Sequence, residues 1–233
     1  MRYTALLVAG LMIAFCPGCK KNTVTLSPLG SLNIVNASVN LGAVKVNFTD
    51  LKGLYSSITT TVASYGNTAY GVNAGVNVPI TIVQTADTTK TAFTGNFTFE
   101  NGGIYSFYLA GQSTAVDTIM VKENIPSYTD SVYGVRFINL SYNSTPITIT
   151  LSTSPTVAQF SNLAYKQASD FKSYNVKVST ATDTFQVRNA ATNAILATYP
   201  IAKPRFFNCT LAWKGMTGGT GSNVPGVLRI NNY

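Results

Sequence analysis

The chain contains no histidine, and this absence excludes several classes of enzyme. Ser-His-Asp and Cys-His nucleophile systems need an imidazole as general base, and histidine-based metal centres need its ring nitrogens. A glycosidase needs two carboxylates facing each other across a cleft. The acidic residues of this chain number only eight and form no such motif. They are Asp50, Asp87, Glu100, Asp117, Glu123, Asp130, Asp170 and Asp183.

Charge of either sign is scarce as well, because only 10% of the residues are charged, against ~25% in an average soluble protein. Disordered chains lack aromatic and β-branched residues, whereas this one has 13 Tyr, 12 Phe and many Val, Ile and Thr. These residue types favour β-strands. The composition therefore predicts a folded, strand-rich protein with a surface of hydroxyls and amides.

Cysteine occurs only three times, at Cys16, Cys19 and Cys209. A structural zinc site needs about four ligands, usually Cys, His or carboxylate, and a chain with no histidine and one further, distant cysteine does not favour such a site at Cys16 and Cys19. A redox C-x-x-C would open a helix in a βαβ unit. Here the pair instead follows Arg2 and the apolar run 5–15, which is the order of a secretory signal. That run is also shorter than the ~20 residues that a membrane-spanning helix needs.

The end of this segment resembles a bacterial lipoprotein signal, because the small residue Gly18 precedes Cys19. We predict a lipoprotein signal peptide over residues 1–18 and lipidation of Cys19, the acyl chains of which would hold the protein on a membrane. Ordinary signal cleavage or an uncleaved anchor are the alternatives. The following lysines are similar to the mature start of many Bacteroidota lipoproteins, which suggests the cell envelope and the outer membrane, with the surface or periplasmic face left open.

Alternating apolar and polar residues predict short strands throughout the rest of the chain. Val44, Val46 and Phe48 alternate with polar residues, as do the apolar residues of 147–151. No window carries a sustained helical pattern. Many short strands with regular turn signals predict an all-β, immunoglobulin-like antiparallel β-sandwich architecture. Further expected strands are 80–84, 96–100, 105–109, 118–121, 174–178, 184–188, 206–213 and 226–230.

An internal repeat gives the domain organisation. Residues 31–48 align without a gap with residues 134–151 at an offset of 103 positions, so that Asn36 meets Asn139 and the apolar positions coincide. We therefore predict two tandem β-sandwich domains that can be separated at a proline-containing junction. The expected segments are the signal peptide at 1–18, a tether at 19–30, the first repeat at 31–123, the junction at 124–133 and the second repeat at 134–233.

Three short motifs carry a family resemblance. The element R-x-x-N-x-S occurs at 136–141, and the first repeat has Asn33 in place of its arginine. Together with Y-x-x-A-S-D-F at 165–171 and Y-x-x-x-L-A-G at 105–111, it resembles the DUF4397 domain. The resemblance implies an envelope protein with immunoglobulin-like modules and no established activity, so it supplies no catalytic residues.

The two halves differ in charge. Residues 20–132 carry six lysines and six acids, whereas residues 133–233 carry nine Lys or Arg and two Asp, a net charge of +7. A basic second domain could contact acidic glycans or anionic lipids, although a solvated surface that only aids solubility explains the same excess. No nucleic-acid-binding motif is present. The candidate polyanion-binding residues are Lys166, Lys172, Lys177, Lys203, Arg205 and Lys214.

Three other features have ordinary explanations. The glycine-rich stretch 215–223 leads into an expected strand and not into a helix, so it predicts a hairpin loop and not a phosphate cradle. Cys209 is expected to be a buried free thiol, and Trp213 a core residue, with a sugar-stacking platform as the alternative. Taken together, the sequence predicts a non-catalytic binding or structural module without cofactor or metal. The alternative is an envelope enzyme that acts on polysaccharide or peptide without histidine, and the oligomeric state is left open.

Overall fold

The computed structural model describes residues 27–49, 55–129, 131–176, 182–202 and 205–232. Cys16, Cys19 and the predicted signal peptide lie outside this range, as do Lys177 and Lys203. The described chain is built from β-strands, with one 3-10 turn at Gly221–Asn223. The prediction of an all-β protein with sandwich domains is therefore confirmed. Within the described residues, no helix is long and apolar enough to cross a membrane.

The first sandwich contains two four-stranded sheets. The strand order is β3-β2-β5-β6 in its outer sheet and β4-β1-β7-β8 in its inner sheet. Its strands are β1 (Leu29–Asn36), β2 (Val44–Asn47), β3 (Thr61–Val62), β4 (Gly66–Asn73), β5 (Asn77–Gln84), β6 (Thr91–Thr98), β7 (Ile104–Gln112) and β8 (Ala115–Lys122).

The second sandwich repeats this plan. The strand order is β11-β10-β13-β14 in its outer sheet and β12-β9-β15-β16 in its inner sheet. Its strands are β9 (Val132–Asn139), β10 (Ile147–Leu151), β11 (Ser154–Leu163), β12 (Lys172–Asn175), β13 (Thr182–Asn189), β14 (Ile195–Ala202), β15 (Phe207–Lys214) and β16 (Gly226–Asn231).

The repeat in the sequence is also a repeat in the topology. Strand β1 pairs in parallel with β7, and its counterpart β9 pairs in parallel with β15, while the other strand pairs are antiparallel. The bounds of β1 and β9 differ by the same 103 positions as the sequence alignment. The glycine-rich stretch connects β15 to its antiparallel neighbour β16, which confirms the hairpin prediction.

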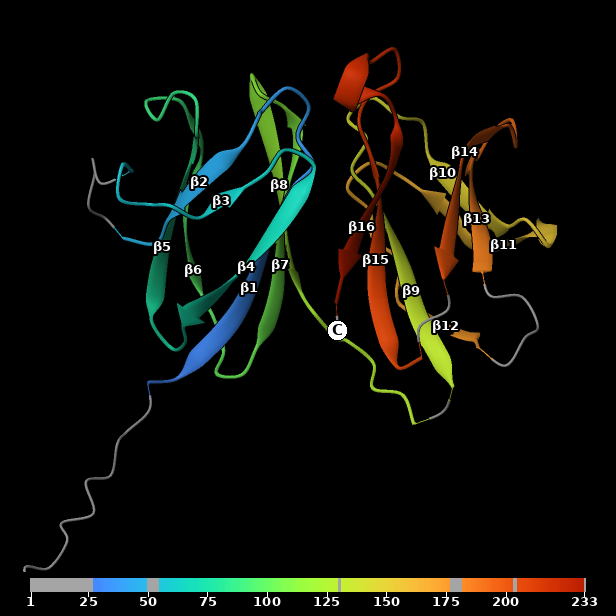
Figure 1. Ribbon diagram of the computed structural model, residues 1–233, viewed down its shortest axis with the longest axis horizontal. Helices are drawn as coiled ribbons and strands as arrows, with labels where there is room; N and C mark the ends of the chain where they lie inside the picture. The colour runs from blue at the N-terminus through green and yellow to red at the C-terminus, as the bar shows by residue number, and fades with distance from the viewer. Residues whose placement is uncertain (1–26, 50–54, 130, 177–181, 203–204, 233) are drawn as a thin grey trace, which may run out of the picture.

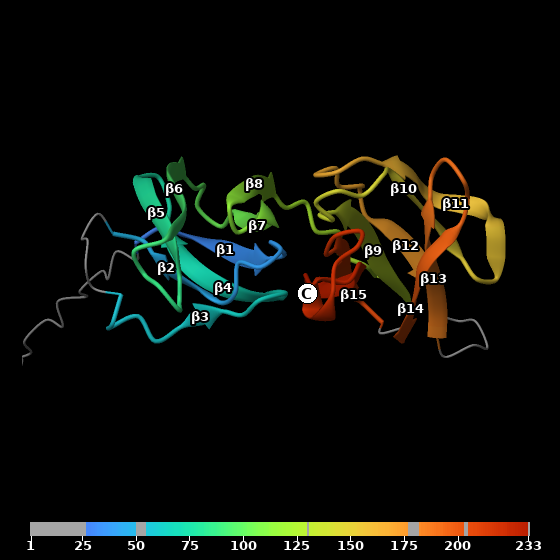
Figure 2. The ribbon, with the colours of Figure 1, turned by 90° about the horizontal axis from the view of Figure 1, so that it is seen from above.

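The four sheets stack as four layers, with the two inner sheets facing each other (Figures 1 and 2). One apolar core lies inside each sandwich, the first around Ile34, Ile80 and Phe107 and the second around Phe137 and Phe185. A third core lies between the sandwiches. The inner strands β7, β9 and β15 are consequently buried along almost their whole length, because both of their faces are covered.

Candidate functional site

The two inner sheets meet in an apolar interface that is made by equivalent positions of the two repeats. Val35 corresponds to Ile138 and Ala37 to Leu140 at the repeat offset, and all four side chains are fully buried. Each inner sheet thus presents the same patch to the other. This is the pattern of an approximate two-fold relation within one chain. The interface core consists of Val35, Ala37, Tyr108, Ala110, Ile138, Leu140, Ala212 and Ile230.

A buried polar network crosses one edge of this interface. Arg136 of β9 donates to the Glu123 carboxylate, which follows β8, and to the Tyr108 hydroxyl at 3.0 Å and Thr210 Oγ1 at 2.8 Å. Its guanidinium also lies 4.9 Å from the centre of the Phe171 ring. Burial raises the pKa of Tyr108. Burial alone would lower the pKa of Arg136, but Tyr108 and Glu123 outweigh it and the pKa lies above its usual value.

A second set of contacts joins the sandwiches through Asp117 of β8. The Asp117 carboxylate accepts hydrogen bonds from the Tyr165 hydroxyl at 2.9 Å and from Lys166 Nζ at 3.0 Å. Burial of Asp117 raises its pKa, but the bonds from Lys166 and Tyr165 together outweigh this effect, so that the pKa lies below its usual value. Arg136 and Lys166, the two cations that form ion pairs across the interface in the described residues, therefore belong to the basic second half and pair with acids of the first.

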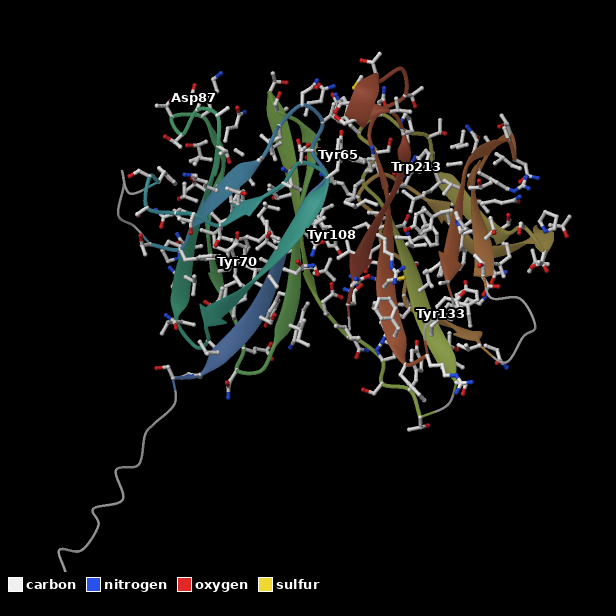
Figure 3. All side chains as sticks on the ribbon, viewed as in Figure 1. Tyr65, Tyr70, Asp87, Tyr108, Tyr133 and Trp213 are labelled. Carbon is white, nitrogen blue, oxygen red and sulfur yellow. The ribbon has the colours of Figure 1, made fainter. Side chains whose placement is uncertain are left out.

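The loop after β15 makes a third set of contacts. Lys214 Nζ lies 4.1 Å from the centre of the Tyr65 ring and donates to the carbonyl oxygens of Ser222 and Val224. The Tyr65 hydroxyl donates to Asn223 Oδ1 at 2.6 Å. Figure 3 shows Tyr65 and Tyr108 on the side of the first sandwich that faces the second. Burial lowers the pKa of Lys214. These contacts fix the two sandwiches in one relative orientation.

A cavity of about 220 Å³ opens between the two inner sheets, and residues of both repeats line it. No charged side chain is among its lining residues. We call this cavity the asparagine cleft, because four of its ten lining residues are asparagines. The lining consists of Ser31, Asn33, Asn67, Ala69, Ile104 and Ser106 from the first repeat, Ile125 from the junction, and Phe207, Asn231 and Asn232 from the second repeat.

The amides of the cleft are held in place by hydrogen bonds that leave part of each amide unused. Asn67 Nδ2 donates to Asn33 Oδ1 at 3.0 Å. Asn231 Oδ1 accepts from Arg229 Nε at 3.0 Å, and Asn232 Oδ1 accepts from Thr210 at 2.6 Å. The Nδ2 groups of Asn33, Asn231 and Asn232, together with Asn67 Oδ1, have no partner among the described residues. Asn232 is only 4% exposed.

The structure describes four of the six predicted polyanion-binding residues, and two of these four lie in the interface between the sandwiches. Lys166 and Lys214 take part in the contacts between the sandwiches. Lys172, on the edge strand β12, and Arg205, in the turn before β15, are exposed and make no ion pair within the described part of the chain. Lys177 and Lys203 lie outside the described residues.

The predictions for Cys209 and Trp213 are confirmed. Cys209 is a free, fully buried thiol in the second core, where burial raises its pKa to about 12. Trp213 belongs to the same core and is only 2% exposed, so its ring offers no open face for stacking on a sugar. Figure 3 shows Trp213 on the upper part of β15.

Four of the carboxylates in the described ranges make ion pairs or hydrogen bonds with side chains distant in the sequence. Asp117 and Glu123 bind across the interface, Asp183 accepts a hydrogen bond from Tyr133, and Glu100 pairs with Lys122. In the same ranges, no group of three or more Cys, Asp or Glu residues could hold a metal ion. Asp50 and Asp130 lie outside the described residues.

The sequence analysis missed the asparagine cleft, because its residues lie far apart in the chain and no local motif unites them. One signal was present. The repeat alignment places Asn33 of the first repeat at the position of Arg136 in the second, and Arg136 is the centre of the buried polar network.

No protein-family model matches the chain, and no curated protein matches its sequence. Among solved structures, it is similar to an α-glucan-binding streptococcal virulence factor (8% identity, 79% of this chain and 93% of that chain, TM-score 0.27). It is also similar to a family 26 carbohydrate-binding module of Eubacterium rectale that was solved with maltoheptaose. The identity is 6%, the match covers 84% of this chain and 99% of that chain, and the TM-score is 0.26. A third similar structure is a candidate adhesin of Bacteroides ovatus. It has 14% identity, the match covers 87% of this chain and 95% of that chain, and the TM-score is 0.25. At TM-scores this low, none of these likenesses bears on what this chain binds.

Proposed function

We propose that this chain is a non-catalytic binding module of the cell envelope, held on the outer membrane by acyl chains on Cys19. Its second sandwich contacts anionic glycans or lipids, and the first connects it to the anchor. The resemblance to the DUF4397 domain and the signal-like residues 1–19 support this proposal from the sequence. The absence of histidine from the chain supports the non-catalytic role.

The pairing of the cations with carboxylates supports an anionic ligand for the second sandwich. In the first sandwich, Lys90 pairs with Asp87 and Lys122 with Glu100. Among the described residues of the second sandwich, the two cations that pair with a carboxylate, Arg136 and Lys166, pair with acids of the first. Contacts between the sandwiches therefore use three of the nine positive charges in residues 133–233, namely these two and Lys214, which lies against the Tyr65 ring. The exposed cations Lys172 and Arg205 are left without a carboxylate partner in the described ranges.

Retention of the mature protein on an immobilised acidic polysaccharide tests this function. We expect retention at low salt that is lost as the salt concentration rises, because charges at a surface are screened over ~8 Å at physiological ionic strength. Vesicles with and without anionic lipid distinguish a lipid surface from a glycan. Failure of the intact protein to bind either surface would contradict the proposal and leave a structural spacer as its role.

A further inference from the structure

The strand registers relate residues of the asparagine cleft to residues of the polar network around Arg136. Asn33 on β1 pairs with Ser106 on β7, and its equivalent Arg136 on β9 pairs with Thr210 on β15, so Ser106 corresponds to Thr210. Ser106 in turn pairs with Val121 on β8, and Thr210 pairs with Ile230 on β16.

Val121 and Ile230 are therefore equivalent positions, and so are the residues that follow each of them by two places. These are Glu123 in the first repeat and Asn232 in the second. The pair Arg136 and Glu123 of the polar network thus corresponds to the pair Asn33 and Asn232 of the cleft.

The two pairs occupy equivalent positions and differ in content. In the polar network, the long side chain of Arg136 reaches the carboxylate of Glu123. In the cleft, both partners are shorter, neutral amides. Both of them line the asparagine cleft, which occupies about 220 Å³. The cleft is thus the place where the second ion pair of a symmetric interface would stand.

We propose that the asparagine cleft binds a neutral, hydroxyl-rich ligand, namely the terminal sugar residue of an uncharged glycan. A sugar hydroxyl both donates and accepts, and the unused Nδ2 groups of Asn33, Asn231 and Asn232 donate while Asn67 Oδ1 accepts. The apolar face of a sugar ring fits the side chains of Ile104, Ile125 and Phe207, which complete the lining. No lining side chain carries a charge to attract an anion.

The size of the cleft and its rigidity limit what it can hold. Pockets for drug-sized ligands usually enclose ~300–1,000 Å³, so a cavity of about 220 Å³ suits one sugar ring more than an extended ligand. The amides are oriented by protein hydrogen bonds before the ligand arrives. The buried network around Arg136 also holds together the two inner sheets that line the cleft. A site organised in this way loses little conformational entropy on binding. This site goes beyond the proposed anionic contact, because it uses different residues and a ligand without charge.

Titration of the mature protein with neutral methyl glycosides of glucose, galactose, mannose and N-acetylglucosamine tests the site, with glucuronate as the charged comparison. We expect at least one neutral glycoside to shift the side-chain amide resonances of the cleft asparagines. Asn33→Ala and Asn231→Ala should each weaken that binding about three- to tenfold, since each removes one hydrogen-bonding amide.

The sharpest variant rebuilds the missing ion pair. Asn33→Arg combined with Asn232→Glu copies the pair Arg136 and Glu123, so it should fill the cleft and weaken glycoside binding more than tenfold while the protein stays folded. The matched control, Asn96→Arg with Thr94→Glu, places the same side chains on the exposed strand β6 and should leave binding unchanged. Lys172→Glu should also leave it unchanged, because that residue belongs to the proposed anionic contact.

Three results would overturn the proposal. The first is that no neutral glycoside shifts the cleft amides, and the second is that glucuronate alone shifts them. The third is that a folded Asn33→Arg/Asn232→Glu protein binds as the unchanged protein does. If this double variant unfolds, Asn33→Ala and Asn231→Ala decide the question. Retention on acidic polysaccharide is measured separately, so the proposed anionic contact and the proposed sugar site can be contradicted independently of each other.

Discussion

Arg136 of the second sandwich donates a hydrogen bond to Glu123 of the first, and both side chains are almost completely buried, at 6% and 0% exposure. Removing one partner of such a pair leaves an uncompensated buried charge, which costs about 3–5 kcal/mol. We therefore expect Glu123→Gln to lower the free energy of unfolding by an amount of this order, measured by urea denaturation followed by circular dichroism.

The exposed pair between Glu100 and Lys122 provides the control for this measurement. Glu100→Gln removes a similar carboxylate that water already solvates, so we expect little change in stability. The double variant Glu123→Gln/Arg136→Met removes both buried charges and should recover much of the loss. Equal effects of Glu123→Gln and Glu100→Gln would show that the buried pair does not stabilise the docked sandwiches.

The lowered pKa of Asp117 predicts that the stability contributed by the same interface depends on pH. Its pKa in the folded protein is lowered, so its contribution to stability is complete above the unfolded-state pKa, ~3.9, and is lost as the pH falls through the folded-state value. Asp117→Asn should therefore melt at a lower temperature than the unchanged protein at neutral pH. The difference should shrink below about pH 4. A difference in melting temperature that stays constant from pH 7 to pH 2 would contradict this assignment.

Cys209 provides a probe of the second core. The thiolate is the reactive form of cysteine, and burial raises the pKa of this thiol to about 12. In a variant with Cys16 and Cys19 replaced by serine, we expect an aromatic disulfide reagent to react very slowly at pH 8 under native conditions and rapidly in denaturant. Fast native labelling would show that β15 opens more readily than its burial implies.

Strands with one face on an apolar core were predicted from the sequence, whereas exposed edge strands were missed. Alternating apolar residues identified β2, β5 and β10, because one face of each lies on a core. Strands β11 and β14 were not predicted. They are the two edges of the second outer sheet, they are largely exposed, and they contain Pro155 and Pro200, which edge strands tolerate. Their apolar pattern is weak because little of either strand is buried.

The docking of the two sandwiches was not predicted either, although a signal for it existed. Strand β7 reads IYSFYLAGQ, a nearly continuous apolar run, which is typical of a strand covered on both faces. The repeat alone suggested separable domains, because it says nothing about the outer faces of the inner sheets. The asparagine cleft depends on that docking, since its lining comes from both repeats and from the junction.

Lipidation at Cys19 is tested by metabolic labelling with palmitate. We expect the unchanged protein to incorporate label and to fractionate with membranes, because buried acyl chains contribute ~0.8 kcal/mol per CH₂ to membrane binding. Cys19→Ala should lose both properties, and Cys16→Ala, the matched control three positions away, should keep them. If Cys16→Ala alone loses the label, the cleavage site lies before Cys16 and not before Cys19.

The last prediction separates the basic residues that hold the sandwiches together from those that are open to a ligand. Lys172 and Arg205 are exposed and lack carboxylate partners within the described residues. Reversing both to glutamate should lower the salt concentration that elutes the protein from acidic polysaccharide and leave the melting temperature almost unchanged.

Lys166 and Lys214 should behave in the opposite way. Lys214→Glu removes a cation that lies 4.1 Å from the Tyr65 ring centre and donates to two carbonyl oxygens, and Lys166→Glu places a carboxylate beside Asp117. Both variants should lower the melting temperature, because they weaken contacts between the sandwiches. The proposed anionic contact would be contradicted if reversing Lys172 and Arg205 left elution unchanged. If elution then depended on Lys166 and Lys214 alone, retention would follow the docking of the sandwiches and not an open basic surface.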